Sequence, residues 1–599
     1  MSLKKTFLFF LIFAFIGTYY YLIEIKKAEK TKEIEKEEKR VFSPVKKEEI
    51  SEITFEKENK KTLRLSKVNN TWKIKEPVEA NIDKDSFDVW IDYVAKIPKE
   101  SIVANSVKNI AEFGLDKPSF TVHVKTDDGS DMTLVSGDEI PTGNMFYSKL
   151  KNKDTIFMIA SYNTVGIDKS AYELRDKKIF HFKNEEVEGF KVATMAGNYS
   201  VEKMDGVWQV VTPVKAPADA EKIASLLQKT RITDIKKFIS EKADDLDSYG
   251  LNDPSTQISF LTGKDKAPHS LAFGIENTEE QGVYAKTSSK NKVFLIKKEF
   301  LNEFPYGVND IRDKSIFQFT NDRINKIQFV FPDKTITTAK NEENNWEIIE
   351  PRKTKADNFE VNSVLNTLSS GKVIDFISKN KEKKNAFALK NPRLTVKLFE
   401  KDSAKPNTIS FGADNQERKA VYADTGSLDE VVLIDNELFS KLDITEISLQ
   451  YKYLLLINED ETARIHIKTS DKEYLIYRTE DKWTIEKPEK KKLETIKVKE
   501  VLWNLGDVKL TDIVEKSGKP DLSAFGLQNP AIKVNLQDDK GNDLESLFIG
   551  TKVKEANVLF AMTDKSNTIY SIEPKLRDEM MNSIKALLIN PPRSDTKEN

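Results

Sequence analysis

Few side chains in this sequence have the types and spacing that catalysis or metal binding requires. The 599 residues include no cysteine and only four histidines, which are His123, His181, His269 and His466. No two of these histidines have the spacing of metal ligands, so we expect them at exposed strand or loop positions. The absence of cysteine excludes a thiol nucleophile, a disulfide scaffold, an iron–sulfur cluster and a cysteine-ligated zinc site. The sequence therefore predicts no catalytic residue, no metal site and no cofactor.

Motifs for phosphate and acyl-transfer chemistry are missing as well. The sequence contains no P-loop, no Gly-x-Gly-x-x-Gly after a strand and no Gly-x-Ser-x-Gly elbow. The 97 acidic residues could supply a carboxylate pair for glycoside hydrolysis almost anywhere, so their presence carries no information. A formal net charge of −2, from interspersed Lys and Glu, argues against a nucleic-acid partner. An extracytoplasmic hydrolase is thus the weakest hypothesis for this chain.

The N-terminus predicts a single-pass membrane anchor over residues 1–23. Two lysines precede an uncharged run, Phe7 to Ile23, which as a helix would extend about 26 Å. Tyr19, Tyr20 and Tyr21 stand where the small residues of a cleavage site would be, so we favour an uncleaved anchor over a cleaved signal peptide. A count of flanking lysines alone would place the bulk in the cytoplasm. Long domains translocate largely regardless of charge, and we expect an extracytoplasmic bulk, which the missing cysteines fit.

Two further segments have the composition of solvated chain. Residues 24–48 are dominated by Lys and Glu and predict a charged stalk between the anchor and the first domain. Residues 591–599 predict a disordered tail. Neither segment predicts a packed core.

The rest of the chain is built from four copies of one unit. A Trp-x-(Ile/Val)-x-x-Pro motif recurs at Trp72, Trp208, Trp346 and Trp483, with spacings of 136, 138 and 137 residues. An aromatic-Gly-Leu-x-x-Pro motif follows each one, beginning at Phe113, Tyr249, Phe387 and Phe525, and its third copy has Ala388 in place of glycine. A glycine that we expect to end a short strand comes next, at Gly137, Gly274, Gly412 and Gly550. Several markers that keep one period exclude coincidence.

Each copy contains one strongly predicted helix. An apolar set at helical spacing begins 15 residues after each tryptophan. Asp83, Asp219 and Asp357 precede the first three sets and predict N-caps. The sets are Phe87/Trp90/Ile91/Val94, Ile223/Leu226/Leu227, Val361/Val364/Leu365/Leu368 and Val498/Val501/Leu502/Leu505.

Alternating apolar and polar residues elsewhere in each copy predict half-buried strands. Examples are 120–124, 271–274, 282–285, 293–296, 324–329, 335–339, 346–349 and 372–377. Asp127-Asp128-Gly129 and Asp538 to Gly541 are typical of hairpin turns. A second helix is expected near the end of each copy, and in the second copy it includes Arg312-Asp313. The same pair stands at Arg175-Asp176, and we interpret it as structural.

These patterns predict an α+β fold with four tandem repeats of a mostly antiparallel sheet and one or two helices. The repeat domains are expected at residues 49–183, 184–319, 320–452 and 453–590. A unit of this length can hold its own core, so the copies are tandem domains and not solenoid repeats.

The repeated aromatic residues allow two interpretations. The four motif tryptophans could line a sugar or peptide groove between domains. A tryptophan that alternates with Ile or Val on a strand is more often part of the core, and we favour that interpretation. The aromatic residues that begin the second motif are also expected to pack.

The N-terminal anchor together with Trp-x-(Ile/Val)-x-x-Pro and Phe/Tyr-Gly-Leu-x-x-Pro resembles an uncharacterised bacterial family with a domain of unknown function. Its members are membrane-anchored tandem-repeat proteins, often encoded beside gliding-motility-type ABC transporter subunits. The resemblance covers nearly the whole chain after residue 48 and departs from the pattern at Ala388. It implies an envelope protein of the bacterial inner membrane, an auxiliary component of an ABC-2-type export system, and no catalytic residues.

Three functions follow as expectations. The first is a non-enzymatic, extracytoplasmic scaffold or partner-binding protein with protein partners in the envelope, among them ABC transporter subunits. The second is an envelope glycan- or polymer-binding protein that uses inter-domain grooves. The third is the extracytoplasmic hydrolase already ranked last.

Overall fold

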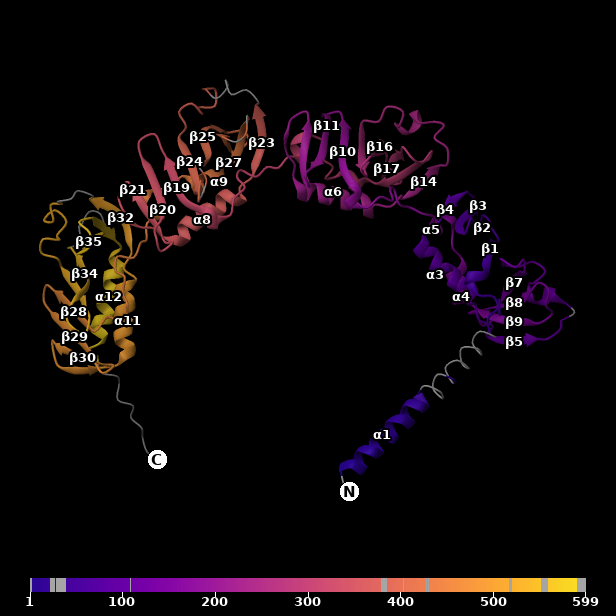
Figure 1. Ribbon diagram of the computed structural model, residues 1–599, viewed down its shortest axis with the longest axis horizontal. Helices are drawn as coiled ribbons and strands as arrows, with labels where there is room; N and C mark the ends of the chain where they lie inside the picture. The colour runs from indigo at the N-terminus through magenta and orange to yellow at the C-terminus, as the bar shows by residue number, and fades with distance from the viewer. Residues whose placement is uncertain are drawn as a thin grey trace. The chain divides into compact units, whose positions relative to one another are not determined.

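The computed structural model describes residues 3–21, 27, 39–107, 109–378, 385–401, 403, 405–426, 428, 430–515, 520–550 and 558–589. The chain divides into two compact units, Met1–Asp313 and Lys314–Asn599, and we describe each by itself (Figure 1). The tail predicted at 591–599 and most of the stalk predicted at 24–48 lie outside the described residues.

The apolar N-terminal segment forms helix α1, Leu3–Tyr19. Within the described ranges, no helix combines the length and the apolarity needed to span a membrane. The anchor at residues 1–23 therefore stays a prediction.

The first unit contains two sheets of nine strands. The first comprises β1 (Ile50–Lys57), β2 (Leu63–Val68), β3 (Thr71–Glu76), β4 (Ala80–Asn81), β5 (Ser101–Ala104), β6 (Phe120–Thr126), β7 (Asp131–Glu139), β8 (Met145–Leu150) and β9 (Ile156–Ala160). The second comprises β10 (Val187–Thr194), β11 (Gly197–Met204), β12 (Val207–Thr212), β13 (Ala216–Pro217), β14 (Lys237–Ser240), β15 (Thr256–Thr262), β16 (Ala267–Asn277), β17 (Gly282–Thr287) and β18 (Val293–Lys297). The helices are α3 (Lys84–Ala95), α4 (Ser161–Ile167), α5 (Ala171–Leu174), α6 (Ala220–Ile232) and α7 (Val308–Ile311), with 3-10 turns η2 (Lys47–Glu49), η3 (Ile110–Phe113), η4 (Asn184–Glu186), η5 (Asp247–Tyr249) and η6 (Lys298–Leu301).

The second unit repeats this organisation. Its first sheet comprises β19 (Ile324–Val330), β20 (Thr335–Lys340), β21 (Trp346–Glu350), β22 (Thr354–Lys355), β23 (Val373–Ser378), β24 (Leu394–Glu400), β25 (Asn407–Asn415), β26 (Ala420–Asp424) and β27 (Val431–Asp435). Its second comprises β28 (Arg464–Thr469), β29 (Glu473–Thr479), β30 (Lys482–Lys487), β31 (Lys491–Leu493), β32 (Leu510–Glu515), β33 (Ile532–Gln537), β34 (Asp543–Ile549), β35 (Leu559–Thr563) and β36 (Ile569–Ile572). The helices are η7 (Asn321–Arg323), α8 (Asn358–Ser370), α9 (Asn436–Leu442), α10 (Glu446–Leu449), α11 (Thr495–Gly506) and α12 (Pro574–Ala586).

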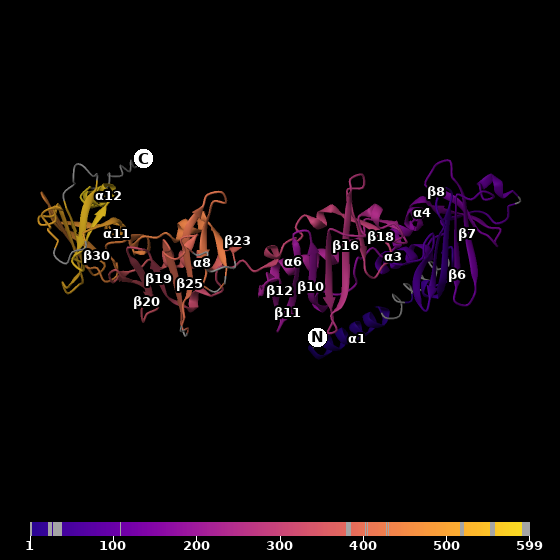
Figure 2. The same cartoon turned by 90° about the horizontal axis from the view of Figure 1, so that it is seen from above.

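All four sheets have the same strand order, which in the first domain is β4-β3-β2-β1-β6-β7-β8-β9-β5. Neighbouring strands pair antiparallel, as between β1 and β6 or between β15 and β16. The fourth and fifth strands form opposite edges of the sheet, so the helix between them must cross one sheet face. Figures 1 and 2 show the helices gathered on one side of each sheet. The predicted α+β class and the four tandem copies are confirmed.

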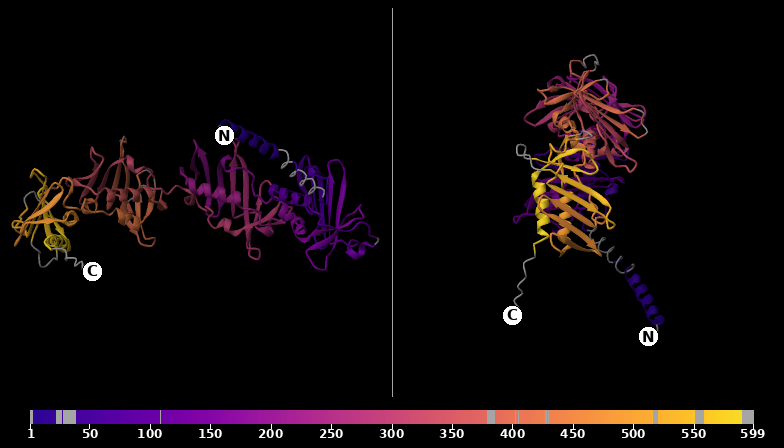
Figure 3. Two further views of the ribbon diagram at one scale, coloured as in Figure 1. Left: turned by 90° about the horizontal axis from the view of Figure 1, so that it is seen from below. Right: turned by 90° about the vertical axis from the view of Figure 1, so that its left-hand side faces the viewer.

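The crossing helix starts where its predicted cap lies in three of the four domains. The carboxylate of Asp83 accepts a hydrogen bond from the backbone N–H of Ser86. Asp219 and Asp357 accept from the amides that follow them in the same way. Glu494 occupies this place in the fourth domain and makes no side-chain cap. In that domain α11 packs beside α12, and the right-hand view of Figure 3 shows this helix pair along one side of the strands.

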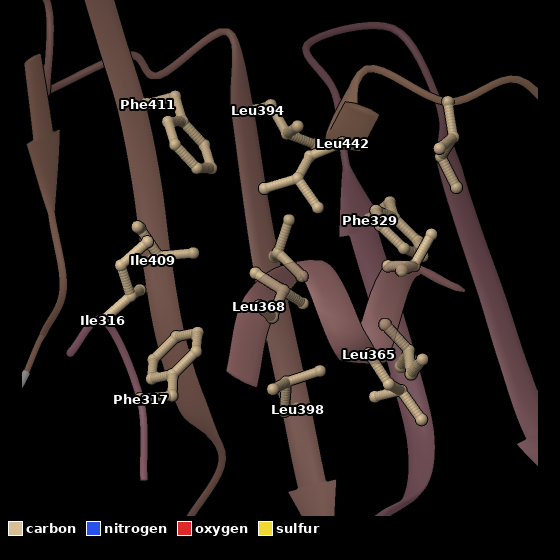
Figure 4. Close-up of a cluster of buried hydrophobic side chains, with 14 of the residues drawn as sticks. Ile316, Phe317, Phe329, Leu365, Leu368, Leu394, Leu398, Ile409, Phe411 and Leu442 are labelled. Carbon is tan, nitrogen blue, oxygen red and sulfur yellow. The ribbon is translucent and has the colours of Figure 1, made fainter. Parts of the chain in front are cut away.

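Every apolar set predicted for these helices is buried. In the third domain, Leu365 and Leu368 of α8 face Phe329, Leu398 and Ile409 of the sheet (Figure 4). A buried aliphatic side chain stabilises the fold by roughly 1.5–3 kcal/mol, so one helix face contributes substantially to each domain.

The four cores are separate, because buried residues cluster within one copy each. Ile179 belongs to the second core and Ile316 to the third, upstream of the expected domain starts at 184 and 320. Val41 and Phe42, assigned to the stalk, are likewise buried in the first core. The expected limits at 184 and 320 lie shortly before the first strand of the second and third copies. Each core, however, also includes an apolar pair further upstream of that strand.

The two sets of recurring glycines lie next to each other, and this contact explains why both sets are glycine. Gly114, Gly250 and Gly526 have φ of 65°, 63° and 65°, the left-handed region in which glycine costs least. The second set, Gly137, Gly274, Gly412 and Gly550, lies against this turn, since a Cβ there would overlap the carbonyl oxygen of Phe113, Tyr249, Phe387 or Phe525. Contrary to expectation, Gly137, Gly274 and Gly412 do not end their strands. They lie at bulges inside β7, β16 and β25, where the turn approaches.

The helix that we expected to include Arg312-Asp313 ends earlier than predicted. Helix α7 stops at Ile311, and Arg312 has extended φ and ψ. The reason is backbone pairing, because Arg312 bridges to Ala218 and Asp313 donates its N–H to the carbonyl of Pro217.

Ala388 adopts φ of 57° where the other copies have glycine. We expect Ala388→Gly to raise the free energy of unfolding by about 0.5–1 kcal/mol, since it removes left-handed strain and loses only part of that gain to unfolded-chain entropy. Gly412→Ala, in the same domain, should lower it by about 3 kcal/mol because its Cβ has no space. Urea unfolding of both variants gives the two signs, and equal signs would contradict this account.

Candidate functional site at the repeat junctions

The four histidines do not assemble a site. His181 and His466 lie beside single carboxylates, Asp176 at 2.9 Å and Glu473 at 2.8 Å, and His123 contacts Asp131. The ring of His269 lies near that of Phe182, with centroids 5.5 Å apart. No group of three His, Asp or Glu side chains that could hold a metal ion occurs in the described part of the chain.

Among the described carboxyl groups, none has the raised pKa that a general acid needs. Wherever the pKa of an Asp or Glu departs from its ordinary value in the described residues, it is lowered. A general acid for glycoside chemistry needs the opposite shift, produced by an apolar environment or a like charge. The charge pattern therefore gives the hydrolase hypothesis no support.

The motif tryptophans belong to the domain cores. Trp346 and Trp483 are 3% and 4% exposed, and Trp72 and Trp208 are half-buried against their own cores. The aromatic residues of the second motif each face a ring on the neighbouring strand, with centroids 4.3–5.1 Å apart. The pairs are Phe113–Tyr147, Tyr249–Tyr284, Phe387–Tyr422 and Phe525–Phe560. A groove lined by these repeated residues is therefore absent from the described structure.

The junction inside the first unit is a short linker that pairs on both sides. Asp176 donates its N–H to the carbonyl of Asn81 in the first domain, at 3.0 Å. One residue later, the carbonyl of Lys177 accepts from Ile235 of the second domain, at 2.8 Å. Backbone hydrogen bonds to two sheets leave this linker little freedom.

Arg175 fixes the same junction through its side chain. Its guanidinium donates two hydrogen bonds to the carboxylate of Glu241, at 2.6 and 2.8 Å, and lies 3.4 Å from the ring centroid of Phe238. Burial alone would raise the pKa of Glu241, but hydrogen bonds from Arg175 and Lys292 outweigh it and lower that pKa. Arg175 is 4% exposed, so its charge depends on this partner. The Arg-Asp pair is structural, as the sequence indicated.

The junction inside the second unit uses the same backbone pairing with another arginine. Tyr451 donates its N–H to the carbonyl of Lys355, and Leu510 donates to Lys452. Gln450 stands where Arg175 stands in the first unit. The guanidinium of Arg352 donates to Glu446 at 2.6 Å, to Gln450 at 2.9 Å and to Thr568 of the fourth domain at 2.9 Å.

A cleft of about 500 Å³ opens at this second junction. Tyr451 and Tyr453 form one wall, with ring centroids 5.2 Å apart. Trp503 on α11 lines it as well and is 72% exposed. The ammonium groups of Lys355 and Lys509 lie 4.3 and 4.7 Å from the centroids of the two tyrosine rings.

Lys509, which lies beside the cleft, and Tyr451, which lines it, both keep their usual protonation states. The pKa of Lys509 is raised, first by a hydrogen bond to Asp507, which lies at 2.9 Å. The pKa of Tyr451 is raised by burial, so its hydroxyl stays neutral. Aromatic faces beside ammonium and hydroxyl groups can stack on a ligand ring and hydrogen-bond to its substituents. These are groups suited to binding a ligand.

The sequence interpretation missed this cleft because it weighed only what the copies share. At the phase of Tyr451 the other copies have Asp176 and Asp313, and at that of Tyr453 they have Lys178 and Ser315. Trp503 corresponds to Asp92, Gln228 and Asn366. Three aromatic residues that replace polar ones at a single junction were the available signal.

Comparison with known proteins gives one family, described as a domain of unknown function. The model of a family described as "Domain of unknown function (DUF4340)" matches residues 72–206, 208–348, 346–519 and 483–588. No curated protein is similar enough to count as a match.

Matches among solved structures are weak. A DNA polymerase sliding clamp from Pseudomonas aeruginosa, crystallised with a ligand, is 8% identical with a TM-score of 0.11, over 66% of this chain and 94% of the clamp. A sliding clamp from the same organism bound to griselimycin is 10% identical with a TM-score of 0.11, over 66% and 92%. Such scores carry no argument about fold or function.

The Arg175–Glu241 contact predicts a pH dependence. The folded pKa of Glu241 lies below its unfolded value, so its stabilisation is complete above the unfolded pKa, about 4.5, and is lost as pH falls through the folded pKa. We expect Glu241→Gln to flatten the loss of stability of the first unit below pH 4.5. Urea unfolding across pH, with Glu221→Gln at an exposed position of α6 as the control, measures it. An unchanged pH profile in Glu241→Gln would contradict the contact.

Arg175→Ala should lower the free energy of unfolding by about 2–3 kcal/mol, because it leaves Glu241 with one partner and uncovers Phe238. Hydrogen exchange at the amides of Asp176 and Ile235 should accelerate with it. Unchanged exchange at both amides would show that the arginine does not hold the junction.

Proposed function

We propose a function on the premise that this chain belongs to the DUF4340 family. The protein is a non-enzymatic scaffold or partner-binding protein of the bacterial inner membrane, anchored by its N-terminus with its four domains outside the cytoplasm. The observation that carries this proposal is the equivalence of the domains, which are four copies of one nine-stranded fold with separate cores. A duplicated scaffold requires each copy to fold and present a surface, whereas an enzyme requires one copy with convergent chemistry.

The junctions support a scaffold further. Within each unit the linker is hydrogen-bonded to the domain on either side, and an arginine side chain, buried in the first unit and partly buried in the second, braces it. Two domains joined in this way present their surfaces at fixed spacing, which favours a partner that contacts both.

Support for the anchor comes from the uncharged run Phe7 to Ile23. Helix α1 carries much of this run, and its large apolar side chains are exposed, Phe13 at 83% and Phe15 at 75%. Apolar area of this size favours an apolar environment. A reporter fused to the C-terminus, active only outside the cytoplasm, tests the orientation.

The partner we propose is an ABC-2-type, gliding-motility-like transporter, on the resemblance of the sequence motifs to that uncharacterised family. Crosslinking in cells, followed by purification of the intact protein from mild detergent, should recover transporter subunits. A variant lacking residues 1–23 is the matched control and should lose them. Recovery of no transporter subunit across several detergents would refute this partner.

A second candidate function is binding of an envelope glycan, and the cleft of Tyr451, Tyr453 and Trp503 favours it. Aromatic faces beside lysine ammonium groups suit sugar rings that carry hydroxyl or carboxylate substituents.

We expect isolated peptidoglycan to co-sediment the full chain, and Trp503→Ser to weaken this at least tenfold. Ile496→Ser is the matched control, because Ile496 is 70% exposed on the same helix and is not among the residues that line the cleft. Equal loss in both variants, or no binding by the parent chain, would refute glycan recognition by the cleft.

A further inference from the structure

The first domain carries an exposed apolar surface, and most of its positions are polar in the other three copies. We call it the repeat 1 patch and define it by Val89 and Tyr93 on α3, Ile102 on β5, and Tyr162 and Val165 on α4. Their exposed fractions are 59%, 49%, 64%, 69% and 69%. Single exposed apolar residues are ordinary, but a group of this size on neighbouring elements indicates a contact surface.

The patch is continuous. Tyr93 packs over α4, where its ring leaves no space for a Cβ at Gly166. Trp90 of α3 joins the same two helices by donating its indole N–H to the carbonyl of Ile167, at 2.9 Å. On the other side, the hydroxyl of Tyr162 lies 3.4 Å from a carboxylate oxygen of Glu100, two residues before Ile102.

The other three copies serve as internal controls for four of these positions. The corresponding residues are all polar, although they stand at matching places in the same fold. They are Ser225, Ser363 and Glu500 for Val89; Lys229, Thr367 and Asn504 for Tyr93; Glu299, Glu437 and Lys575 for Tyr162; and Asn302, Ser440 and Asp578 for Val165. Because the fold tolerates polar residues here, packing within the domain does not explain the apolar ones.

Ile102 adds a different argument. Its counterpart in the second domain is Phe238, which the guanidinium of Arg175 covers from the first domain. Ile102 occupies the same place on its sheet edge and stays 64% exposed. Within the described residues, this apolar position of the first domain stays exposed, whereas Arg175 covers its counterpart in the second domain.

We propose that the repeat 1 patch lies on the lipid surface of the membrane, an inference that rests on the anchor proposed above. The described chain resumes at Lys39, whose carbonyl accepts a hydrogen bond from Lys99, at 2.8 Å, beside Glu100. Residues 22–38 are the whole connection from the apolar helix, and even fully extended they reach no more than about 65 Å. This connection holds the patch at high effective concentration near the bilayer, so a weak lipid contact is sufficient.

The composition of the patch fits the membrane interface. Tyrosine prefers the headgroup level, where its ring is in apolar surroundings and its hydroxyl is hydrated, and Val and Ile partition below it. The nearest charges are of both signs, because the carboxylate of Asp92 pairs with Lys47 at 2.9 Å and with Lys96 at 2.8 Å, and the carboxylate of Glu100 lies beside the hydroxyl of Tyr162. The contact therefore depends on apolar insertion and does not require anionic lipid.

The absence of native cysteine makes the test direct, since one introduced cysteine carries one nitroxide label. Three full-length variants, Phe13→Cys, Val165→Cys and Asn302→Cys, are labelled and placed in phosphatidylcholine nanodiscs. Collision with oxygen and with a water-soluble nickel chelate gives the depth of each label. We expect the label at 165 to lie below the phosphate level, and the label at 302, its match in the second domain, to lie in water. Adding phosphatidylglycerol should leave both depths unchanged.

The outcomes separate the two proposals. A label in the bilayer at 13 and in water at 165 overturns the lipid contact and leaves the anchor intact. A label in water at 13 overturns the anchor and the lipid contact together. A label at 165 that is shielded from both oxygen and nickel assigns the patch to a protein contact and also overturns the lipid contact.

Discussion

Backbone N–H and C=O groups removed from water must find partners, and the linkers between domains satisfy this requirement on both sides at once. Lys177 bonds to the second domain one residue after Asp176 bonds to the first. The segment around Arg40 meets the first sheet in the same manner, through a bridge to Pro98. Because the linkers inside both units pair with a sheet edge in this way, the start of the following domain and the burial of the apolar pair behind it follow from the pairing.

Much of the fold could be predicted from the sequence, because its determinants are local. The spacing of Val361, Val364, Leu365 and Leu368 specified both a helix and its buried face, and Asp357 marked its start. The role of the glycine pairs could not be predicted, because it depends on a contact between a turn and a strand more than 20 residues apart in the sequence. An example is the contact between Phe113 and Gly137. The end of α7 at Ile311 was missed for a similar reason, since Arg312 leaves the helix to pair with a distant residue.

The candidate site was harder to predict from the sequence than the fold, and the repeats explain why. Residues common to all copies, such as Trp346 and Phe387, maintain the fold and are buried or paired. Residues that distinguish one copy, such as Trp503 or Val165, are exposed, and they mark the cleft and the patch. In a tandem protein the shared pattern reports the architecture, and departures from it report what each domain does with its surface.

The separation of the four cores at their linkers has a consequence for the history of the chain. Buried clusters end at Leu174, Ile311 and Leu449 and resume at Ile179, Ile316 and Leu454. A recombination event with breakpoints in two such linkers would add or remove a whole domain without dividing a core. The number of domains can therefore change between descendants while each domain keeps its stability, and a new copy is free to diverge at its surface.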